Sequence, residues 1–143
     1  MFFITWITDN LAIGPALNST DLAELKNIRI AAVIDVRSEA TDDGSLLKKS
    51  GIDFLHIDVD DRHSPTKEQL DSILNFANPL LDKNKRILVH CQNGYGRSPL
   101  VVIAILVNRG MDISDAISLM YGKHPTATFT PQQEKFIYGL KNF

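Results

Sequence analysis

The sequence contains a single cysteine, Cys91, among its 143 residues. One cysteine excludes an internal disulfide and is typical of a protein that folds in a reducing compartment. The longest apolar run, residues 99–107, is too short to cross a bilayer, and residues 1–6 lack the positive start of a signal peptide. These absences predict a cytoplasmic protein that has no membrane partner.

The sequence also lacks a strong excess of either charge, because its net charge is only −2. A near-neutral chain is not generally attracted to nucleic acid, so we expect no nucleic-acid partner. Repeats, low-complexity tracts and linker-like segments are absent as well. With 44% hydrophobic and 22% charged residues, residues 1–143 predict one globular domain, which we expect to be a monomer.

Short apolar segments alternate with helical patterns along the chain. The expected strands are residues 2–6, 11–13, 31–36, 54–59 and 87–89, and the expected helices lie near residues 20–28, 46–50, 65–81, 99–109, 113–121 and 131–140. Ser64 before Pro65, and Thr130 before Pro131, are typical of helix starts. The strand–helix–strand order of residues 54–89 predicts a parallel pair. The predicted fold class is α/β, with a central, mostly parallel, twisted sheet of about five strands flanked by helices.

Residues 86–99 are the most informative stretch of the sequence. Residues 87–89 are typical of a buried strand, residues 92–96 are polar and contain two glycines, and Pro99 suits the first turn of a helix. A strand, a tight loop and a helix start bring several backbone N–H groups and the positive end of a helix dipole to one point. The stretch therefore predicts an anion-binding site.

Cys91 and Arg97 stand at the two ends of this loop, with five residues between them. Loop amides, the helix dipole and the guanidinium all favour the thiolate, so we expect the pKa of the Cys91 thiol to fall below the free value of about 8.5. Cys91 is thus a candidate nucleophile. The alternative is that it is a small buried hydrophobe, although that role would not require Arg97 or the glycines.

Two neighbouring carboxylates follow the preceding expected strand. Asp60 and Asp61 lie at its carboxyl end, as Cys91 lies at the end of the next strand. Ligands of α/β sheets bind beyond the carboxyl ends of the parallel strands. We therefore expect the acidic loop, residues 60–63, and the thiol to face one cleft.

These residues resemble a known family. His90-Cys91, five residues and Arg97-Ser98 resemble the signature of the cysteine-dependent protein tyrosine phosphatases, and residues 94–99 are most similar to the dual-specificity branch. The resemblance implies a protein tyrosine phosphatase-like fold and hydrolysis of phosphate monoesters through a phosphocysteine intermediate, with no cofactor and no metal. It also implies a phosphorylated protein or peptide as substrate, with phosphotyrosine as the main target and phosphoserine or phosphothreonine as further ones.

The resemblance assigns a role to most of the loop. Cys91 would be the nucleophile, and Arg97 would bind the phosphate and its transition state through a planar fork that lysine lacks. The substrate-binding residues would be Gln92, Asn93, Gly94, Tyr95 and Gly96. Ser98 would stabilise the departing thiolate, although it is also a candidate helix N-cap before Pro99.

The family uses an aspartate on the loop after the preceding parallel strand as its general acid and base. Asp61 best matches that position, and Asp60 is the second choice. His90 matches a histidine that supports the loop from behind, and Gln132 and Gln133 resemble glutamines near the water site. The family often has Arg-Pro where this sequence has His124-Pro125, so the contact which that arginine makes to the loop has no assured counterpart.

Other functions remain open from the sequence. A non-catalytic phosphopeptide-binding module would share the loop, and a phosphatase could act on a small-molecule or lipid phosphate instead of a protein. A rhodanese-like sulfurtransferase also uses a cysteine in an anion-binding loop. Metal-dependent hydrolysis is a further alternative, because residues 56–63 gather two histidines and three aspartates, namely His56, Asp58, Asp60, Asp61 and His63.

Overall fold

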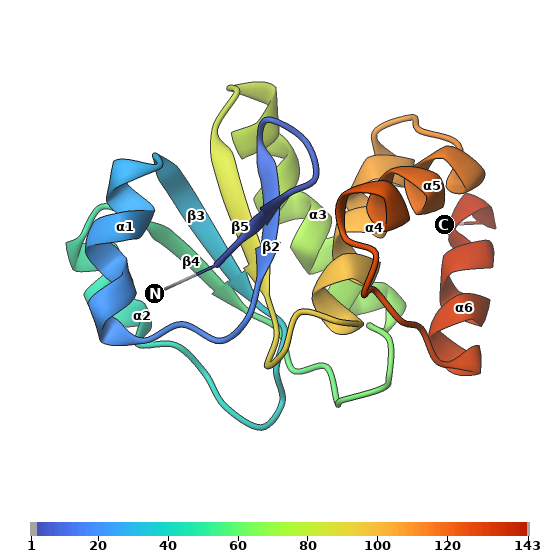
Figure 1. The fold of residues 1–143 in the computed structure, drawn as a ribbon, viewed down its shortest axis with the longest axis horizontal. Coiled ribbons are helices and arrows are strands. Elements are labelled where there is room, and N and C mark those ends of the chain that lie inside the picture. The colour runs from blue at the N-terminus through green and yellow to red at the C-terminus, as the bar shows by residue number, and fades with distance from the viewer. Residues whose placement is uncertain (1–2, 143) are drawn as a thin grey trace.

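A computed structural model describes residues 3–142 and contains one five-stranded sheet (Figure 1). Its strands are β1 (Thr5–Trp6), β2 (Leu11–Gly14), β3 (Ile30–Asp35), β4 (Asp53–His56) and β5 (Arg86–His90). They follow the spatial order β1-β2-β5-β3-β4. Only β1 runs antiparallel to its neighbour, and the other three pairs are parallel. The predicted α/β class with a mostly parallel sheet of five strands is confirmed.

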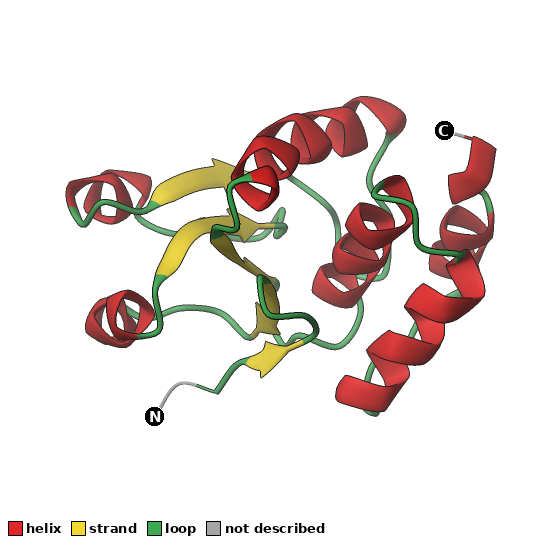
Figure 2. Cartoon of the chain, turned by 90° about the horizontal axis from the view of Figure 1, so that it is seen from above, coloured by secondary structure: helices red, strands yellow, loops and turns green. Residues whose placement is uncertain are grey.

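Helices cover both faces of the sheet (Figure 2). They are α1 (Leu22–Asn27), α2 (Gly44–Lys49), α3 (Lys67–Asp82), α4 (Arg97–Asn108), α5 (Ile113–Lys123) and α6 (Pro131–Tyr138), with short 3-10 helices η1 (Ser19–Asp21) and η2 (Leu140–Asn142). The helices α1 and α2 pack on one face, and α3 to α6 form the thicker layer on the other. Among residues 3–142, no helix is long and apolar enough to cross a bilayer.

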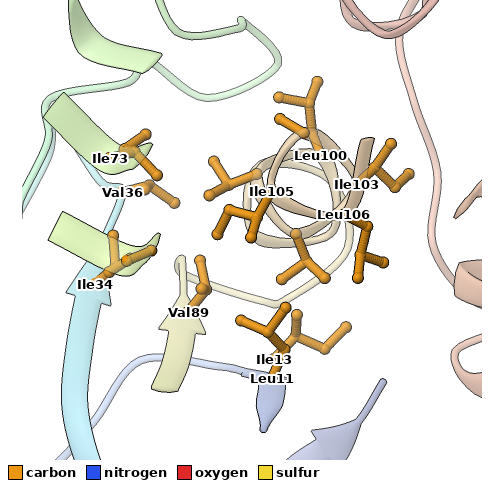
Figure 3. Packing of buried hydrophobic residues seen from close by; sticks show 14 of the residues in the cluster. Leu11, Ile13, Ile34, Val36, Ile73, Val89, Leu100, Ile103, Ile105 and Leu106 are labelled. Atoms are coloured by element: carbon orange, nitrogen blue, oxygen red, sulfur yellow. The ribbon is translucent and has the colours of Figure 1, made fainter. Parts of the chain in front are cut away.

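The central strand β5 serves both layers because its side chains alternate between the two faces. Ile87 and Val89 pack in the larger core, and Leu88 packs in the smaller one. Helix α4 lies against the larger face and is buried all round, as expected for a helix in the middle of a layer (Figure 3). Both ends of the loop that joins β5 to α4 are therefore anchored in the core.

Two strands are shorter than the sequence predicts. The first begins at Thr5, and the predicted start at Phe2 lies outside the described residues. The strand predicted for residues 54–59 ends at His56, although Ile57 and Val59 beyond it are still buried. Alternating burial continues past His56, the last residue of β4 that is paired with β3, so the pattern alone overestimates the strand.

Two helix starts also differ from the predictions. Helix α3 begins after Thr66 instead of Ser64, because Thr66 Oγ1 accepts a hydrogen bond from Gln69 N and the Gln69 side chain bonds back to Thr66 N. Helix α4 begins after Gly96, so Ser98 lies inside its first turn and is not the N-cap. The capping box predicted at Thr130 is confirmed.

Candidate active site

The loop of residues 91–96, here called the cysteine loop, lies at the carboxyl edge of the sheet, at the lower edge in Figure 1. The loops that follow β3 and β4 emerge at the same edge. Gly94 adopts φ +78°, and a Cβ atom there would lie 3.3 Å from the carbonyl oxygen of Gly14. Glycine is required at this position both by the backbone conformation and by the close approach of β2.

Cys91 is buried, and two groups on the cysteine loop and α4 contact its sulfur. The Sγ atom lies 3.4 Å from Ser98 Oγ and accepts a hydrogen bond of 3.3 Å from Gly94 N. Both groups can donate to a negatively charged sulfur. The start of α4 also directs its free N–H groups toward this loop, so the electrostatic surroundings of the sulfur favour an anion.

Arg97 is held by a residue that the sequence did not single out. Its Nη1 and Nη2 atoms donate to Glu39 Oε1 and Oε2, each at 2.7 Å, and Nη1 also donates to Val59 O at 2.8 Å. The hydrogen bonds from Arg97 lower the pKa of Glu39 from 4.5 to about 2, and the carboxylate raises the pKa of Arg97. Within residues 3–142 these bonds use only the terminal nitrogens, so the Nε edge of the guanidinium is left for a ligand.

The two candidate acids occupy different positions. The Asp61 carboxylate lies 3.8 Å from Arg97 Nη2 and lines the same cavity as Cys91. Among the described residues that line this cavity, Asp60 is not found; its carbonyl oxygen instead closes a turn by accepting a hydrogen bond from His63 N. Arg62, which follows Asp61, adopts φ +68°, and this residue turns the chain sharply inside the acidic loop.

The cavity in front of Cys91 has a volume of about 430 Å³. Three parts of the chain line it: the cysteine loop with Arg97, the residues Glu39 and Asp61, and the segment around the start of α6. The lining residues of that segment are Thr128, Phe129, Thr130, Pro131 and Gln133. The cavity therefore combines an anion-binding loop with aromatic lining residues, Tyr95 and Phe129.

The two glutamines of α6 differ in position. Gln133 is buried, accepts a hydrogen bond from Thr130 N through Oε1, and donates one of 3.0 Å to His63 O through Nε2. Thr130 Oγ1 donates to Arg62 O at 3.0 Å. These bonds attach the acidic loop to the start of α6. Gln132 is exposed and is not among the described residues that line the cavity.

His124 stands where the family often has an arginine that contacts the cysteine loop, and His124 makes a contact to this loop. Its Nε2 atom donates a 2.9 Å hydrogen bond to Gly94 O in the cysteine loop. The residue follows α5 directly, at the point where that helix ends. A histidine therefore connects α5 to the cysteine loop at the position where the family often has arginine.

A buried group of charged side chains lies behind the cysteine loop. His90 Nε2 donates to Asp42 Oδ2 at 2.5 Å, and Arg37 donates to Asp35, to Asp42 and, at 3.2 Å, to Gln92 Oε1. The hydrogen bond with Asp35 raises the pKa of Arg37. The ion pair of Asp35 and Arg37 is buried, and through Arg37 it also contacts Gln92 in the cysteine loop.

The charged residues that the sequence did not connect to the site lie mainly on the segment that follows β3, residues 36–43, here called the β3 loop. Through Arg37, Glu39 and Asp42 it contacts the cysteine loop or the residues beside it. One signal was available, because the β3 loop also begins at the carboxyl end of a parallel strand. Its charged residues have no motif spacing that would connect them to Cys91.

Metal ligation has little support from this geometry. In the part of the chain that the structure describes, Asp35, Asp42 and His90 are the acidic and imidazole groups whose ligand atoms lie close together. Arg37 Nη2, however, already donates to both aspartates, so the guanidinium supplies the positive charge that a metal ion would otherwise bring to these carboxylates. His56, from the other candidate cluster, bonds to the Arg37 carbonyl and lies 3.3 Å from Asp58.

Comparison with known proteins gives consistent matches. Residues 11–142 match the family described as the dual specificity phosphatase catalytic domain. The dual specificity protein phosphatase OPG106 of Vaccinia virus (strain Copenhagen) is 27% identical over 122 residues, which are 85% of this chain and 68% of that protein. Its counterpart from Monkeypox virus is also 27% identical, over the same shares of both chains.

Solved structures agree in fold. The crystal structure of Tk-PTP in the active form has a TM-score of 0.86 and 27% identity, and the match covers 97% of this chain and 96% of that chain. The crystal structure of PTPMT1 in complex with PI(5)P has a TM-score of 0.89 at 20% identity and covers 97% and 94% of the two chains. The second likeness is one of fold alone.

Proposed function

Because the chain belongs to the dual specificity phosphatase family and is thus a cysteine-dependent protein phosphatase, we propose that it hydrolyses phosphotyrosine through a phosphocysteine intermediate. Phosphoserine and phosphothreonine are further substrates in this proposal. The observation that carries it is that Cys91, Arg97 and Asp61 all line one cavity. Nucleophile, anion-binding cation and acid are the three groups that cleavage of a phosphate monoester requires.

In the first step the Cys91 thiolate attacks phosphorus in line with the ester oxygen. The S–P bond forms as the P–O bond to the leaving group breaks. Backbone N–H groups of the cysteine loop and the Nε edge of Arg97 hold the phosphoryl oxygens, and Glu39 keeps the guanidinium in place.

Asp61 supplies the proton that the leaving oxygen needs. Its position in the cavity and its distance of 3.8 Å from Arg97 Nη2 support Asp61 over Asp60. A positioned general acid contributes a factor of about 10² to 10⁴, most for leaving groups that are strongly basic. The hydrogen bonds from Thr130 and Gln133 to the acidic loop support this position.

In the second step water attacks the phosphocysteine, and Asp61, now ionised, accepts the proton of that water. The S–P bond breaks and inorganic phosphate leaves. Ser98 Oγ, which lies 3.4 Å from Sγ, donates a hydrogen bond to the departing thiolate. Gly94 N, at 3.3 Å, makes the second such contact.

The preference for phosphotyrosine rests on the residues that line the cavity. Tyr95, Phe129 and Pro131 are among them, and a phenyl ring would pack against them while its phosphate reaches the cysteine loop. The cysteine loop carries no lysine, and Arg62 and Arg97 are the described cations that line the cavity. Few cations suit a monophosphate better than a polyphosphorylated lipid headgroup.

Turnover of para-nitrophenyl phosphate tests the chemistry. We expect activity that persists in a chelator and is abolished in Cys91→Ser, while that variant still binds vanadate or phosphate. Absence of turnover in the folded protein would favour a phosphopeptide-binding module, and loss of activity with chelator would favour a metal enzyme. Cleavage of thiosulfate would indicate a sulfurtransferase.

A substrate panel tests specificity. Matched peptides that differ only in phosphotyrosine, phosphoserine or phosphothreonine should be ranked by kcat/KM, beside vesicles that contain phosphoinositides and small sugar phosphates. The proposal expects the phosphotyrosine peptide to lead. Phosphate release mainly from the vesicles or the sugar phosphates would contradict it.

A further inference from the structure

We propose that Asp42 is a positioning residue that keeps His90 doubly protonated, so that a buried imidazolium stands directly behind Cys91. The inference deepens the proposed phosphatase function, on which the role of Cys91 rests. Asp42 belongs to the β3 loop, and His90 is the last residue of β5. No resemblance in the sequence connects Asp42 to the site.

Both ring nitrogens of His90 face oxygen atoms that accept hydrogen bonds. His90 Nε2 lies 2.5 Å from Asp42 Oδ2, and His90 Nδ1 lies 3.3 Å from Cys91 O. A carbonyl oxygen only accepts, and an ionised carboxylate only accepts. A neutral imidazole has one N–H and satisfies one of these partners; an imidazolium has two and satisfies both.

A cation also faces the Asp42 carboxylate. Its Oδ1 atom accepts a hydrogen bond of 3.3 Å from Arg37 Nη2. A protonated Asp42 would need to direct its own proton to a nitrogen of His90 and would weaken its pairing with Arg37. The short contact to His90 therefore fits a charge-assisted hydrogen bond from an N–H of the ring to a carboxylate.

The charges of the buried group also favour a protonated His90. The groups that face His90 are Asp35 on β3, whose Oδ2 lies 4.0 Å from Nε2, Asp42 on the β3 loop, and Cys91 beside it; Arg37 bridges the two aspartates. All four side chains of the group of Asp35, Arg37, Asp42 and His90 are at most 7% exposed. Two anions and one cation would leave a net negative charge here, and a protonated His90 cancels it. Buried charges are tolerated when they are paired and hydrogen-bonded.

The consequence falls on Cys91. A cation behind the nucleophile stabilises the thiolate, whereas Asp42 alone, as a nearby anion, would destabilise it. Replacing Asp42 therefore has opposite effects in the two cases. If Asp42 acts through His90, its removal lets the imidazolium lose a proton and the thiolate becomes less stable. If Asp42 acts only through its own charge, its removal stabilises the thiolate.

The first experiment observes His90 in the unaltered protein. Nitrogen-15 correlation spectra of the histidine side chains at neutral pH, with His90 assigned by comparison with His90→Gln, should show protons on both ring nitrogens. A neutral tautomer of His90 would overturn the proposal. The spectra do not depend on turnover, so an inactive protein with a charged His90 contradicts only the phosphatase function.

The second experiment follows alkylation of Cys91, the only thiol of the chain, by iodoacetate as a function of pH. In Asp42→Asn the midpoint should move to higher pH by about one unit. Asp43→Asn is the matched control, because it removes the same charge from the exposed neighbouring residue and keeps a side-chain oxygen for the cap of α2. It should leave the midpoint in place.

The pair of Asp42 and His90 is then tested together. His90→Gln should shift the midpoint in the same direction, and Asp42→Asn should add nothing in that background. A shift to lower pH in Asp42→Asn, an unchanged midpoint, an equal shift in Asp43→Asn, or additive shifts in the double variant would each overturn the proposal. If Asp42→Asn does not fold, the spectra of the unaltered protein decide.

Discussion

The ion pair between Glu39 and Arg97 gives the sharpest quantitative prediction. Glu39→Gln keeps the size of the side chain and one oxygen, but replaces a two-pronged, charge-assisted contact with a neutral one. If Glu39 orients the guanidinium for the phosphoryl group, kcat/KM must fall. If Glu39 instead competes with substrate for Arg97, its neutralisation must lower KM.

The magnitude follows from the pKa of Glu39. The value falls from 4.5 to about 2, and a difference of about 2.5 corresponds to about 3.4 kcal/mol. The Glu39 side chain is 42% exposed, so solvent screening reduces this figure to about 1 to 2 kcal/mol. A loss of that size in transition-state binding lowers kcat/KM by about 5- to 30-fold.

Steady-state hydrolysis of an aryl phosphate and a phosphotyrosine peptide measures this loss. Glu24→Gln, on the exposed side of α1 at the other face of the sheet, is the control and should be unaffected. An unchanged kcat with a lower KM in Glu39→Gln would refute the orienting role. Since the folded pKa is depressed, the pair is complete above pH 4.5 and is lost as the pH falls through about 2, so it should not shape the activity profile near neutrality.

Three further predictions concern the acid, the loop and the core. Asp61→Asn should slow esters with poor leaving groups by about 10² or more and activated aryl phosphates much less, whereas Asp60→Asn should have little effect; the reverse result would exchange the two assignments. Gly94→Ala should reduce both the rate of Cys91 alkylation and the melting temperature, because alanine is strained at φ +78° and its Cβ would lie 3.3 Å from the Gly14 carbonyl oxygen. An unchanged alkylation rate and melting temperature would contradict this prediction. Ile103→Ala, at a fully buried side chain of α4, should cost about 2 to 5 kcal/mol of unfolding free energy in a urea titration while the remaining folded protein keeps its kcat.

Local patterns predicted most of the fold and the centre of the site. The apolar segment at residues 87–89, the two glycines of the loop and Pro99 each act within a few residues of Cys91, so the sequence shows them directly. The capping box at Thr130 was predictable for the same reason. The βαβ order then placed Asp61 at the same edge of the sheet as Cys91.

Contacts between distant residues were not predictable in this way. Glu39 meets Arg97 across 58 positions of the sequence, and Asp42 meets His90 across 48. The path of the β3 loop through space determines which distant residues meet, and the spacing of residues within a single helix or strand does not reveal that path. The start of α3 was missed for a different reason, since Ser64-Pro65 and Thr66 with Gln69 both have the form of a helix start, and only the second forms the reciprocal hydrogen bonds.

Gln133 lines the cavity and also uses both ends of its amide to hold two distant segments of the chain together. Its oxygen accepts a hydrogen bond from Thr130 N at the beginning of α6, while its nitrogen donates one to the His63 carbonyl 70 positions away. A carboxylate at this point would repel that carbonyl, and an aliphatic chain would leave both ends without a partner. The Gln133 amide, together with the Thr130 hydroxyl, thereby joins α6 to the turn that bears Asp61, so position 133 admits little chemical variety.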